Sequence, residues 1–397
     1  MKVLAVADSD SYLKWAACLL GGLPPGCTAE LTVIRTPITP SPAQIRAAVS
    51  GSAAEPPVLS ARALRRTAER FRPDAVLVAC TGPVVDILTA EVLAGLSPRP
   101  VFVSGLPGIS VPATEKAWLF RSGCDLFVLH SGREVEEFSE VGRRLGGGGQ
   151  VGLARLPFLR PGADAAAAPG PRDRVVFATQ AKVPRRRGDR ERILLALADL
   201  AGRRPDLDVV VKLRALADER QTHNERHHYQ RLWQDLGGSP GALRFEGGPM
   251  HEHLARAAGF VTVSSTAALE AIALGVPLLV LSDFGVSAEM INLVFEGSGV
   301  LGTLDDLAEG RFRTPDEAWC EANYFHGGGE DDWTSRLVSL VGQARSGRLV
   351  PARSLLDGPQ YAAARRRARL RVEVPPNVLR VGYRAKRRMR RYLRALG

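Results

Sequence analysis

The chain has 397 residues, of which 45% are hydrophobic, and this length and composition favour two domains with ordinary cores over one. The net charge is +11, but residues 361–397 hold 12 arginines and Lys386 against a single acid, Glu373. Residues 1–360 therefore carry a net charge of −1, which does not suggest that this part of the chain binds nucleic acid. The five cysteines are odd in number and contain no Cys-x-x-Cys pair, which argues against a disulfide framework and against a zinc site.

The N-terminus is apolar only from residue 3 to residue 7, where Asp8 interrupts the run. This stretch is too short for the apolar core of a secretory signal, so we expect a first strand and a cytoplasmic protein. The longest apolar window, residues 257–281, is interrupted by Glu270, a Ser/Thr cluster and Pro277. A buried strand-helix-strand unit explains this window better than a membrane span does.

Predicted strands and helices alternate in two sets, a pattern typical of parallel sheets with helices on both faces. The first set has strands at 3–7, 31–35, 75–79, 101–103 and 126–129, and the second has strands at 174–177, 209–213, 244–245, 260–263 and 278–281. Residues 161–171 between them are rich in Pro, Gly and Ala and predict a linker. We therefore expect domains at 1–160 and 172–345, followed by a basic helical tail at 346–397.

Small and polar residues follow the predicted strands of the first domain. Asp8 and Asp10 follow the first strand, Ser104 and Gly105 follow the fourth, and Gly108 comes three residues later. In open α/β sheets, ligands bind outside the carboxyl ends of the strands. Two sheets with such ends facing each other would form a cleft between the domains.

The second domain contains the segment 261–281, which predicts a strand, a Ser/Thr turn, a helix and a return strand. The turn is Ser264, Ser265 and Thr266, and the helix after it begins with amides that lack partners inside the helix. Such amides and hydroxyls attract phosphate, helped by the helix dipole. Glu270 lies one turn further on the face of Thr266, where its carboxylate can accept from both ribose hydroxyls. The alternative is an ordinary N-capped turn between a strand and a helix.

The pattern Ser-Ser-Thr-(x3)-Glu-Ala-(x3)-Gly-x-Pro, from Ser264 to Pro277, resembles the donor-site signature of GT-B glycosyltransferases and UDP-N-acetylglucosamine 2-epimerases. It is also similar to capsule-type and polysialic-acid-type transferases of bacteria and to a glycosyltransferase family catalogued as a domain of unknown function. The resemblance implies two Rossmann-like parallel-sheet domains facing a cleft. It also implies that Ser264, Ser265 and Thr266 hold the phosphates of a nucleotide-sugar donor and that Glu270 holds its ribose.

Lys212 and Arg214 straddle the end of a predicted strand of the donor domain. The run Val-Val-Val-Lys-Leu-Arg at 209–214 resembles the Lys-Leu-His-Pro of capsule-type transferases. Arg214 and Ala215 replace the His-Pro pair that contacts the nucleotide phosphate there, and a guanidinium can bind phosphate in its place. The alternative is a charge in solvent at the end of a strand.

Three further residues of the second domain are candidates for the donor side. Thr179 and Gln180 follow its first strand, and His251 begins the helix that leads to the Ser/Thr turn, a position that borders the base in related folds. His251 and His253 are two residues apart and point to different sides of a helix, so we expect them to bind no common metal ion. The hydroxyls, helix amides and Lys/Arg pair can stabilise the departing phosphate, so we expect neither a metal nor another cofactor.

Glycosyl transfer needs a base that activates the acceptor hydroxyl. We consider Asp8, Asp10 and Glu115 as candidates, because each follows the carboxyl edge of the first sheet. For each of them a helix cap or first-turn acid is the alternative. The run from Gly105 to residue 109, which includes Gly108, resembles the glycine-rich acceptor loops of GT-B enzymes, so Ser104, Gly105 and Gly108 are assigned to the acceptor side.

Within residues 361–397, apolar side chains recur at helical spacing between clusters of arginine, which predicts a basic amphipathic helix. These side chains are Val378, Val381, Ala385, Met389, Tyr392 and Leu396. An anionic membrane on the cytoplasmic side is the partner that we favour for this segment. The alternatives are a helix folded back on the body and a nucleic-acid contact, for which the aromatic residues are too sparse.

We therefore expect a metal-independent GT-B glycosyltransferase that moves a hexosyl or sialyl group from a nucleotide sugar to a cell-surface glycan or glycolipid. The resemblance leaves CMP-linked and UDP-linked donors open. One alternative is a nucleotide-sugar 2-epimerase of the same fold, which needs acid and base pairs and no acceptor. The other is a non-catalytic protein that binds nucleotides or nucleic acid.

Overall fold

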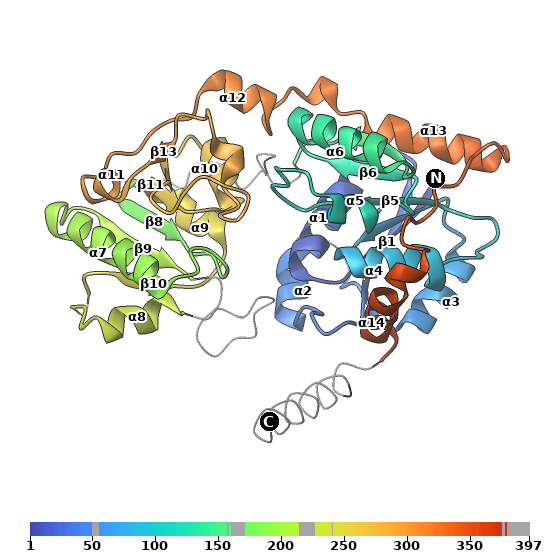
Figure 1. Ribbon diagram of the computed structural model, residues 1–397, viewed down its shortest axis with the longest axis horizontal. Helices are drawn as coiled ribbons and strands as arrows, with labels where there is room; N and C mark the ends of the chain where they lie inside the picture. Colours follow the sequence, from blue (N-terminus) through green and yellow to red (C-terminus); the bar gives the residue numbers. More distant parts are fainter. Residues whose placement is uncertain are drawn as a thin grey trace. The chain divides into compact units, whose positions relative to one another are not determined.

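A computed structural model of the protein describes residues 1–49, 55–156, 159, 171–213, 227–239, 241–374 and 378. The chain divides into two compact units (Figure 1). Unit 1 comprises Met1–Pro107, Ala113–Pro157 and Gly327–Gly397, and unit 2 comprises Gly108–Pro112 and Phe158–His326. Each unit is built on one parallel β-sheet. No helix among these residues is long and apolar enough to span a membrane.

Unit 1 contains a seven-stranded sheet in the order β3-β2-β1-β4-β5-β6-β7, and all neighbouring strands are parallel. The strands are β1 (Lys2–Ala7), β2 (Thr28–Ile34), β3 (Val58–Leu59), β4 (Ala75–Ala79), β5 (Val101–Gly105), β6 (Leu126–Leu129) and β7 (Gln150–Leu153). The chain moves outward from β1 to β3 and then returns to the other side of β1. The strand order therefore reverses between β1 and β4, which makes this pair the topological switch point of the unit.

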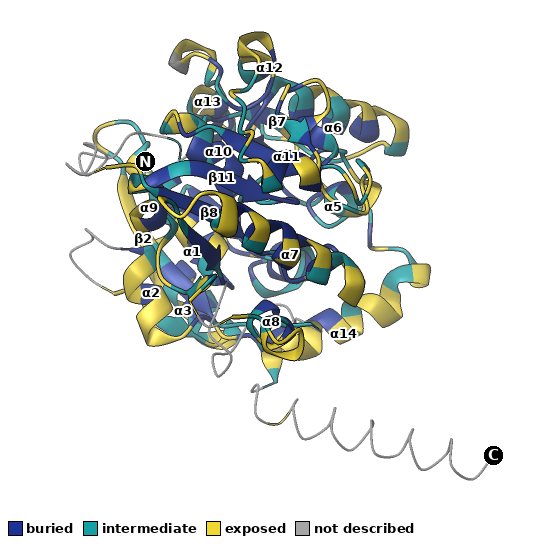
Figure 2. Cartoon of the chain, turned by 90° about the vertical axis from the view of Figure 1, so that its left-hand side faces the viewer, coloured by how far each residue is buried: buried dark blue, intermediate teal, exposed yellow. Residues whose placement is uncertain are grey.

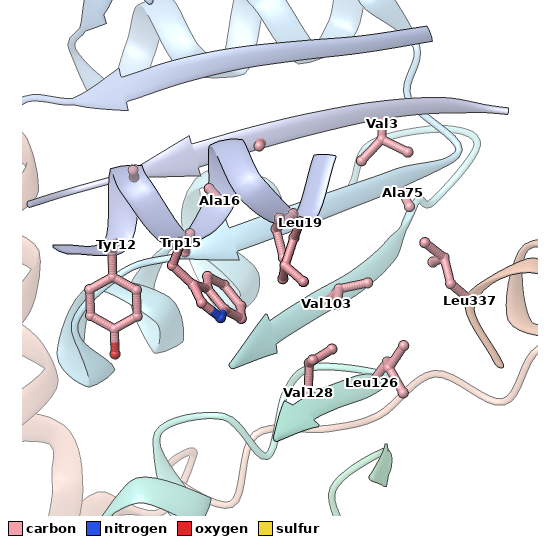
Figure 3. Close-up of a cluster of buried hydrophobic side chains, with 14 of the residues drawn as sticks. Val3, Tyr12, Trp15, Ala16, Leu19, Ala75, Val103, Leu126, Val128 and Leu337 are labelled. Carbon is pink, nitrogen blue, oxygen red and sulfur yellow. The ribbon is translucent and has the colours of Figure 1, made fainter. Parts of the chain in front are cut away.

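Helices cover both faces of the first sheet because alternate residues of each strand point to opposite sides. Val3, Ala5 and Ala7 of β1 pack with α1 (Asp10–Gly21), α2 (Pro42–Ala48) and α13 (Trp333–Arg345), as Figure 3 shows for part of this cluster. Leu4 and Val6 pack with α3 (Ala61–Phe71), α4 (Gly82–Ile87), η1 (Leu88–Val92) and α14 (Ala362–Glu373). The helices α5 (Glu115–Leu119) and α6 (Gly132–Leu145) pack around Phe127 and Leu129 of β6.

Unit 2 contains a six-stranded parallel sheet in the order β10-β9-β8-β11-β12-β13. The strands are β8 (Arg174–Ala178), β9 (Asp208–Lys212), β10 (Arg244–Glu246), β11 (Ala257–Thr262), β12 (Leu278–Leu281) and β13 (Leu301–Gly302). This is the strand order of the dinucleotide-binding Rossmann fold. Its switch point lies between β8 and β11.

The longest described helix of unit 2 buries one apolar stripe. In α7 (Arg187–Arg203), Ile193, Leu194, Leu197 and Leu200 recur at helical spacing and pack against the strands, whereas the outer side of α7 is exposed (Figure 2). The other helices that the described part of unit 2 contains are α8 (Tyr229–Asp235), α9 (Met250–Ala255), α10 (Ala267–Ala273), η4 (Leu293–Phe295), α11 (Leu304–Ala308) and α12 (Glu317–Ala322). Two short turns, η5 (Gly328–Glu330) and η6 (Pro359–Tyr361), belong to unit 1.

All ten predicted strands are present, with ends that differ from the predicted ones by at most three residues. The sequence analysis missed β3, β7 and β13. Two of these strands have two residues and the third has four, so none is long enough to show a repeating pattern of buried side chains.

The C-terminal part of the chain is arranged differently from the expected division at residue 345. By its contacts unit 2 ends at His326, and α13 packs against β5, β6 and β7 of unit 1. The apolar stripe of α13, which includes Trp333 and Leu337, suits either sheet, so its spacing does not tell which sheet it covers. The predicted linker lies outside the described residues except for residue 171.

Of the predicted tail, the structure describes residues 346–374 and Val378. Residues 362–373 form α14, which folds back on unit 1 and buries Ala368 and Val372. This helix precedes the apolar positions on which the predicted amphipathic helix rests, so its packing does not test whether that helix folds back on the body. Most of the predicted amphipathic pattern, residues 379–397, lies outside the described residues.

Candidate functional site

Of the donor residues predicted from sequence, those that follow β8 and β11 lie at the switch point of unit 2. Ala178, the last residue of β8, pairs in register with Thr262, the last residue of β11. Thr179 and Gln180 after β8 therefore lie beside the segment that leads to Ser264 after β11. In Rossmann-like sheets this position, outside the carboxyl ends of the two central strands, is where nucleotides bind.

The Ser/Thr turn differs in detail from the expected helix start. The N–H of Ala267 donates to Ser265 Oγ at 3.2 Å, and the N–H groups of Ala268 and Leu269 donate to the carbonyls of Ser265 and Thr266. The first amides of α10 are thus already paired, which corrects the expectation that they are open to a ligand. The helix has only seven residues, so its dipole is small.

The open donors of this turn lie just before the helix. Within the described ranges, the N–H groups of Ser265 and Thr266 and the hydroxyl of Thr266 have no hydrogen-bond partner in the protein. Both residues are half-buried. Two adjacent amides and one hydroxyl can bind the oxygens of a phosphate group without the helix amides.

Glu270 and Ser264 have separate places at this turn. Glu270 is half-buried in the first turn of α10, four residues after Thr266 and therefore on the same side of the helix. Ser264 is buried, and its hydroxyl donates to the carbonyl of Ile291 at 2.6 Å. Ser264 therefore fixes the turn instead of offering a hydroxyl to a ligand.

The loop after β12 supports this turn, a role that the sequence analysis missed. Ile291 has a φ of +60°, which is unusual for a β-branched residue, and its carbonyl accepts from Ser264. Asn292 is fully buried and joins the two sides of the loop, because its side chain accepts from the N–H of Ser287 and donates to the carbonyl of Gly285. No local sequence pattern signals these contacts, which join residues of different elements.

The remaining predicted donor residues have varied surroundings. Thr179 is buried, and both its N–H and its hydroxyl donate to the carbonyl of Lys212, at 3.2 and 3.1 Å. Gln180 and Lys212 are half-buried. His251 is exposed at the start of α9, whereas His253 is buried and hydrogen-bonds to Gly247, so the two histidines do point to different sides. Arg214 lies outside the described residues.

In unit 1, Asp8 joins the two strands of the switch point. Asp8 follows β1 and is fully buried, and its Oδ2 accepts from the N–H and the hydroxyl of Thr81 after β4, at 2.9 and 2.5 Å. Its Oδ1 is also buried and has no partner in the described part of the chain. Burial raises the pKa of Asp8, while the hydrogen bonds from Thr81 and the charge of Arg121 lower it.

Tyr12 and Arg121 form a buried polar cluster near Asp8 that the sequence analysis missed. Arg121 is 4% exposed, and it donates from Nη2 to the hydroxyl of Tyr12 at 2.7 Å and from Nε to the carbonyl of Gly105 at 3.0 Å. Burial raises the pKa of Tyr12. Tyr12 lies four residues after Asp8, on the inner side of α1 (Figure 3). The short spacing from Asp8 could have pointed to Tyr12, but nothing in the local sequence around Arg121 indicates its place in this cluster.

The other two candidate bases are less buried than Asp8. Asp10 is half-buried at the first position of α1. Glu115 is exposed at the first position of α5, where its carboxylate pairs with Arg144 at 2.9 Å. Asp8 is therefore the candidate with a buried, unpaired carboxylate oxygen, and Glu115 matches a first-turn acid in a surface ion pair.

The acceptor-side residues have structural explanations of their own. The hydroxyl of Ser104 donates to the carbonyl of Val78, and a Cβ at Gly105 would lie 2.7 Å from the carbonyl oxygen of Val128 and closer still to Trp15. Gly108 belongs to the short segment grouped with unit 2, where a Cβ would lie 2.9 Å from Thr266 Oγ1. A side chain at residue 108 would therefore crowd the open hydroxyl of the Ser/Thr turn.

His130, which follows β6, has a structural role. Its Nε2 accepts from the indole N–H of Trp15 at 2.7 Å, and its Nδ1 lies 2.8 Å from the carbonyl of Ala154. An indole N–H can only donate and a carbonyl can only accept, so these contacts fix one neutral tautomer with the proton on Nδ1. No group of three or more His, Cys, Asp or Glu residues in the described chain is arranged to hold a metal ion.

The sequence matches, over residues 3–340, a family described as "Putative glycosyltransferase (DUF6716)". No curated protein matches the chain. Three solved structures have a similar fold. One is the co-structure of S. aureus MnaA with UDP (TM-score 0.57, 13% identity, 89% of this chain and 99% of that chain). The others are UDP-GlcNAc 2-epimerase from Neisseria meningitidis bound to UDP-GlcNAc (TM-score 0.56, 15% identity, 86% and 100%) and a "putative UDP-N-acetylglucosamine 2-epimerase" from Listeria monocytogenes (TM-score 0.56, 15% identity, 87% and 97%). At these identities the likeness shows the fold alone, which is of the two-domain Rossmann-like, GT-B type.

Proposed function

Because the chain belongs to the family described as "Putative glycosyltransferase (DUF6716)", we propose that it transfers a sugar from a nucleotide-sugar donor to an acceptor hydroxyl. The observation that carries the proposal is the turn after β11, where two open N–H groups, an open hydroxyl and Glu270 meet at the switch point of unit 2. Solved structures of the same fold hold UDP and UDP-GlcNAc, which supports a donor of this class.

Each part of the donor has a proposed partner. The N–H groups of Ser265 and Thr266 and the hydroxyl of Thr266 bind the phosphates, and Glu270 accepts from the hydroxyls of the ribose. Lys212 adds a positive charge near the end of β9. Donors that are already oriented toward the phosphate stabilise the charge that develops as the nucleotide leaves. We propose that the transfer needs no metal ion.

Asp8 is the proposed base. The proton of the acceptor hydroxyl moves to Oδ1 of Asp8, the acceptor oxygen forms a bond with the anomeric carbon, and the bond between that carbon and the phosphate oxygen breaks. The nucleotide leaves with the bonding electrons. Burial raises the pKa of Asp8, and a carboxylate with a raised pKa is a stronger base than an exposed one.

The acceptor and the cellular setting complete the proposal. We propose a cell-surface glycan or glycolipid as the acceptor, a hexosyl or sialyl group as the transferred sugar, and a cytoplasmic protein that contacts the inner face of the membrane through residues 361–397. The tail supports this contact by its composition, since 12 of its residues are arginines.

Nucleotide binding by calorimetry tests the donor site. UDP, CDP, CMP and GDP are titrated into the wild type, into Glu270→Ala and into Glu296→Ala, which removes an exposed glutamate elsewhere in unit 2. We expect one nucleotide to bind the wild type selectively, and its affinity to fall about tenfold or more in Glu270→Ala because hydrogen bonds to a carboxylate are lost. Glu296→Ala should bind like the wild type.

Two results would contradict the proposal. If none of the nucleotides binds, the donor assignment fails. If the matching nucleotide sugar is converted to an epimer without any acceptor, the protein is a 2-epimerase of the same fold, and mass spectrometry of the sugar product separates this outcome from transfer.

A further inference from the structure

Two helices of unit 1 carry rows of exposed arginines. On α3, Arg62, Arg66 and Arg70 are four residues apart and form one stripe. On α14, three more exposed arginines lie on one side of the helix by their spacing, and these are Arg366, Arg367 and Arg371. We call these six residues the basic face.

The two rows point away from the same face of the sheet. The inner sides of the helices, with Ala68 of α3 and Ala368 of α14, belong to one apolar cluster that packs on Leu4 and Val6 of β1. Both helices also contact η1, because Arg65 of α3 donates to the carbonyl of Val92 and α14 places an arginine beside Glu91. The helices α3 and α14 thus both lie against η1 in unit 1.

The carboxylates on this side are all engaged by other arginines. Glu69 pairs with Arg65, both Asp86 and Glu91 pair with Arg365, and Glu373 pairs with Arg369. Within the described ranges, no side chain of the basic face has an ion pair or a hydrogen bond. The surface therefore presents six positive charges that no described carboxylate pairs with.

The residues between these arginines favour a lipid surface over a nucleic acid. Leu370 of α14 is 45% exposed and lies between Arg366 and Arg367 around the helix, so an apolar side chain projects with the charges. Neither of these two described helices has an aromatic residue on its outer side on which a base could stack. Arginines with an exposed leucine suit anionic headgroups above an acyl layer.

We propose that the basic face, on α3 as well as α14, docks unit 1 on an anionic lipid bilayer. This inference builds on the membrane contact proposed for residues 361–397 and extends it to α3, which lies roughly 300 residues earlier in the chain. It does not depend on glycosyl transfer. The arginines would hold the surface of unit 1 against the anionic headgroups, and the side chain of Leu370 would insert between the headgroups toward the acyl layer.

Co-sedimentation with vesicles tests the inference on the full-length chain. The vesicles contain phosphatidylcholine alone or with about one third phosphatidylglycerol. Two triple variants each remove one row, R62Q/R66Q/R70Q and R366Q/R367Q/R371Q. The matched control removes three exposed arginines of unit 2 that have no ion pair with a described residue, and is R186Q/R203Q/R231Q.

We expect the wild type to bind only the vesicles with phosphatidylglycerol, and binding to weaken as salt is raised. Each row variant should lower the partition coefficient by about one hundredfold, since each arginine near the surface contributes about fivefold. The control should change it by less than about threefold. Circular dichroism and thermal unfolding should match the wild type, because the six side chains are exposed and form no ion pair or hydrogen bond within the described ranges.

Three outcomes would overturn the inference. R62Q/R66Q/R70Q could bind like the control. If a variant lacking residues 379–397 then fails to bind the vesicles, the result supports the proposed tail contact and contradicts its extension to α3. Alternatively, the row variants could keep vesicle binding and lose affinity for single-stranded DNA, which would assign the face to nucleic acid. Equal binding to both kinds of vesicle would remove the role of charge altogether.

Discussion

Asp8 shows how a single position can combine structural and chemical roles. Its Oδ2 joins the ends of β1 and β4 through Thr81, while its buried Oδ1 has no partner among the described residues. An unpaired buried oxygen costs free energy of folding, so its presence at the switch point favours a functional explanation. The sequence placed Asp8 correctly after a strand, but neither its burial nor its partner Thr81 follows from local pattern.

We predict that the stability of Asp8→Asn relative to the wild type increases as the pH rises. The pKa of Asp8 is raised in the folded protein, so the protonated form contributes stability below the ordinary aspartate pKa. This contribution is lost as the pH rises through the folded pKa, whereas an asparagine does not titrate. Urea unfolding of both proteins between about pH 4 and pH 8 measures the difference.

Asp10→Asn serves as the reference for removing a carboxylate from the same segment. A stability difference between the wild type and Asp8→Asn that stays constant over this pH range, or that changes in the opposite direction, would contradict the prediction.

In Asp8→Asn we also expect kcat to fall by about a hundredfold or more, because the base is lost.

At the scale of elements, α14 is one helix with two different sides. Arg365 lies on the inner side, where its Nε donates to Asp86 at 2.9 Å, and the Asp86 side chain is 3% exposed. Arg366, the next residue, is exposed and unpaired within the described chain. The arginine-rich composition predicted a basic helix without telling which of its arginines face the protein. The ion pair of Arg365 with Asp86 on α4 marks the inner side.

We predict that Arg365→Gln lowers the free energy of unfolding by about 2–3 kcal/mol, because Asp86 loses the cation that balances its buried charge. Burial raises the pKa of Asp86 and Arg365 lowers it, so protonation of Asp86 can relieve part of the loss. Arg366→Gln is the matched control and should change stability by less than about 0.5 kcal/mol. Urea unfolding at neutral pH measures both. Equal effects of the two variants would show that α14 does not dock through Arg365.

For the whole molecule, the chain builds unit 1 from its two ends. After unit 2 ends at His326, the segment that begins at Gly327 returns to unit 1 and supplies α13 and α14. Trp333 and Leu337 of α13 complete the core beneath β5, β6 and β7. Without α13, that face of the sheet would be exposed to water, so the integrity of unit 1 depends on residues that follow unit 2.

We predict that Leu337→Ala destabilises unit 1 by about 2–4 kcal/mol, because a fully buried leucine leaves a cavity in its core. Hydrogen exchange followed by mass spectrometry should show faster exchange in β5, β6 and β7, with β8, β11 and β12 unchanged. Leu195→Ala, at a 51% exposed leucine of α7, is the matched control and should leave both units protected. Faster exchange in β8, β11 and β12 would instead assign α13 to unit 2.

The sequence by itself determined the elements and part of the candidate site. Ten strands followed from apolar runs, and the spacing from Ser264 to Glu270 placed a turn and a carboxylate on one side of a helix, because these patterns are local. Only the tertiary structure decided the strand orders, which bring Asp8 to Thr81 and the end of β8 beside β11. It also decided that Arg121 reaches Tyr12 and that α13 covers unit 1. These outcomes depend on contacts between residues far apart in the chain, whose free energies no short stretch of sequence contains.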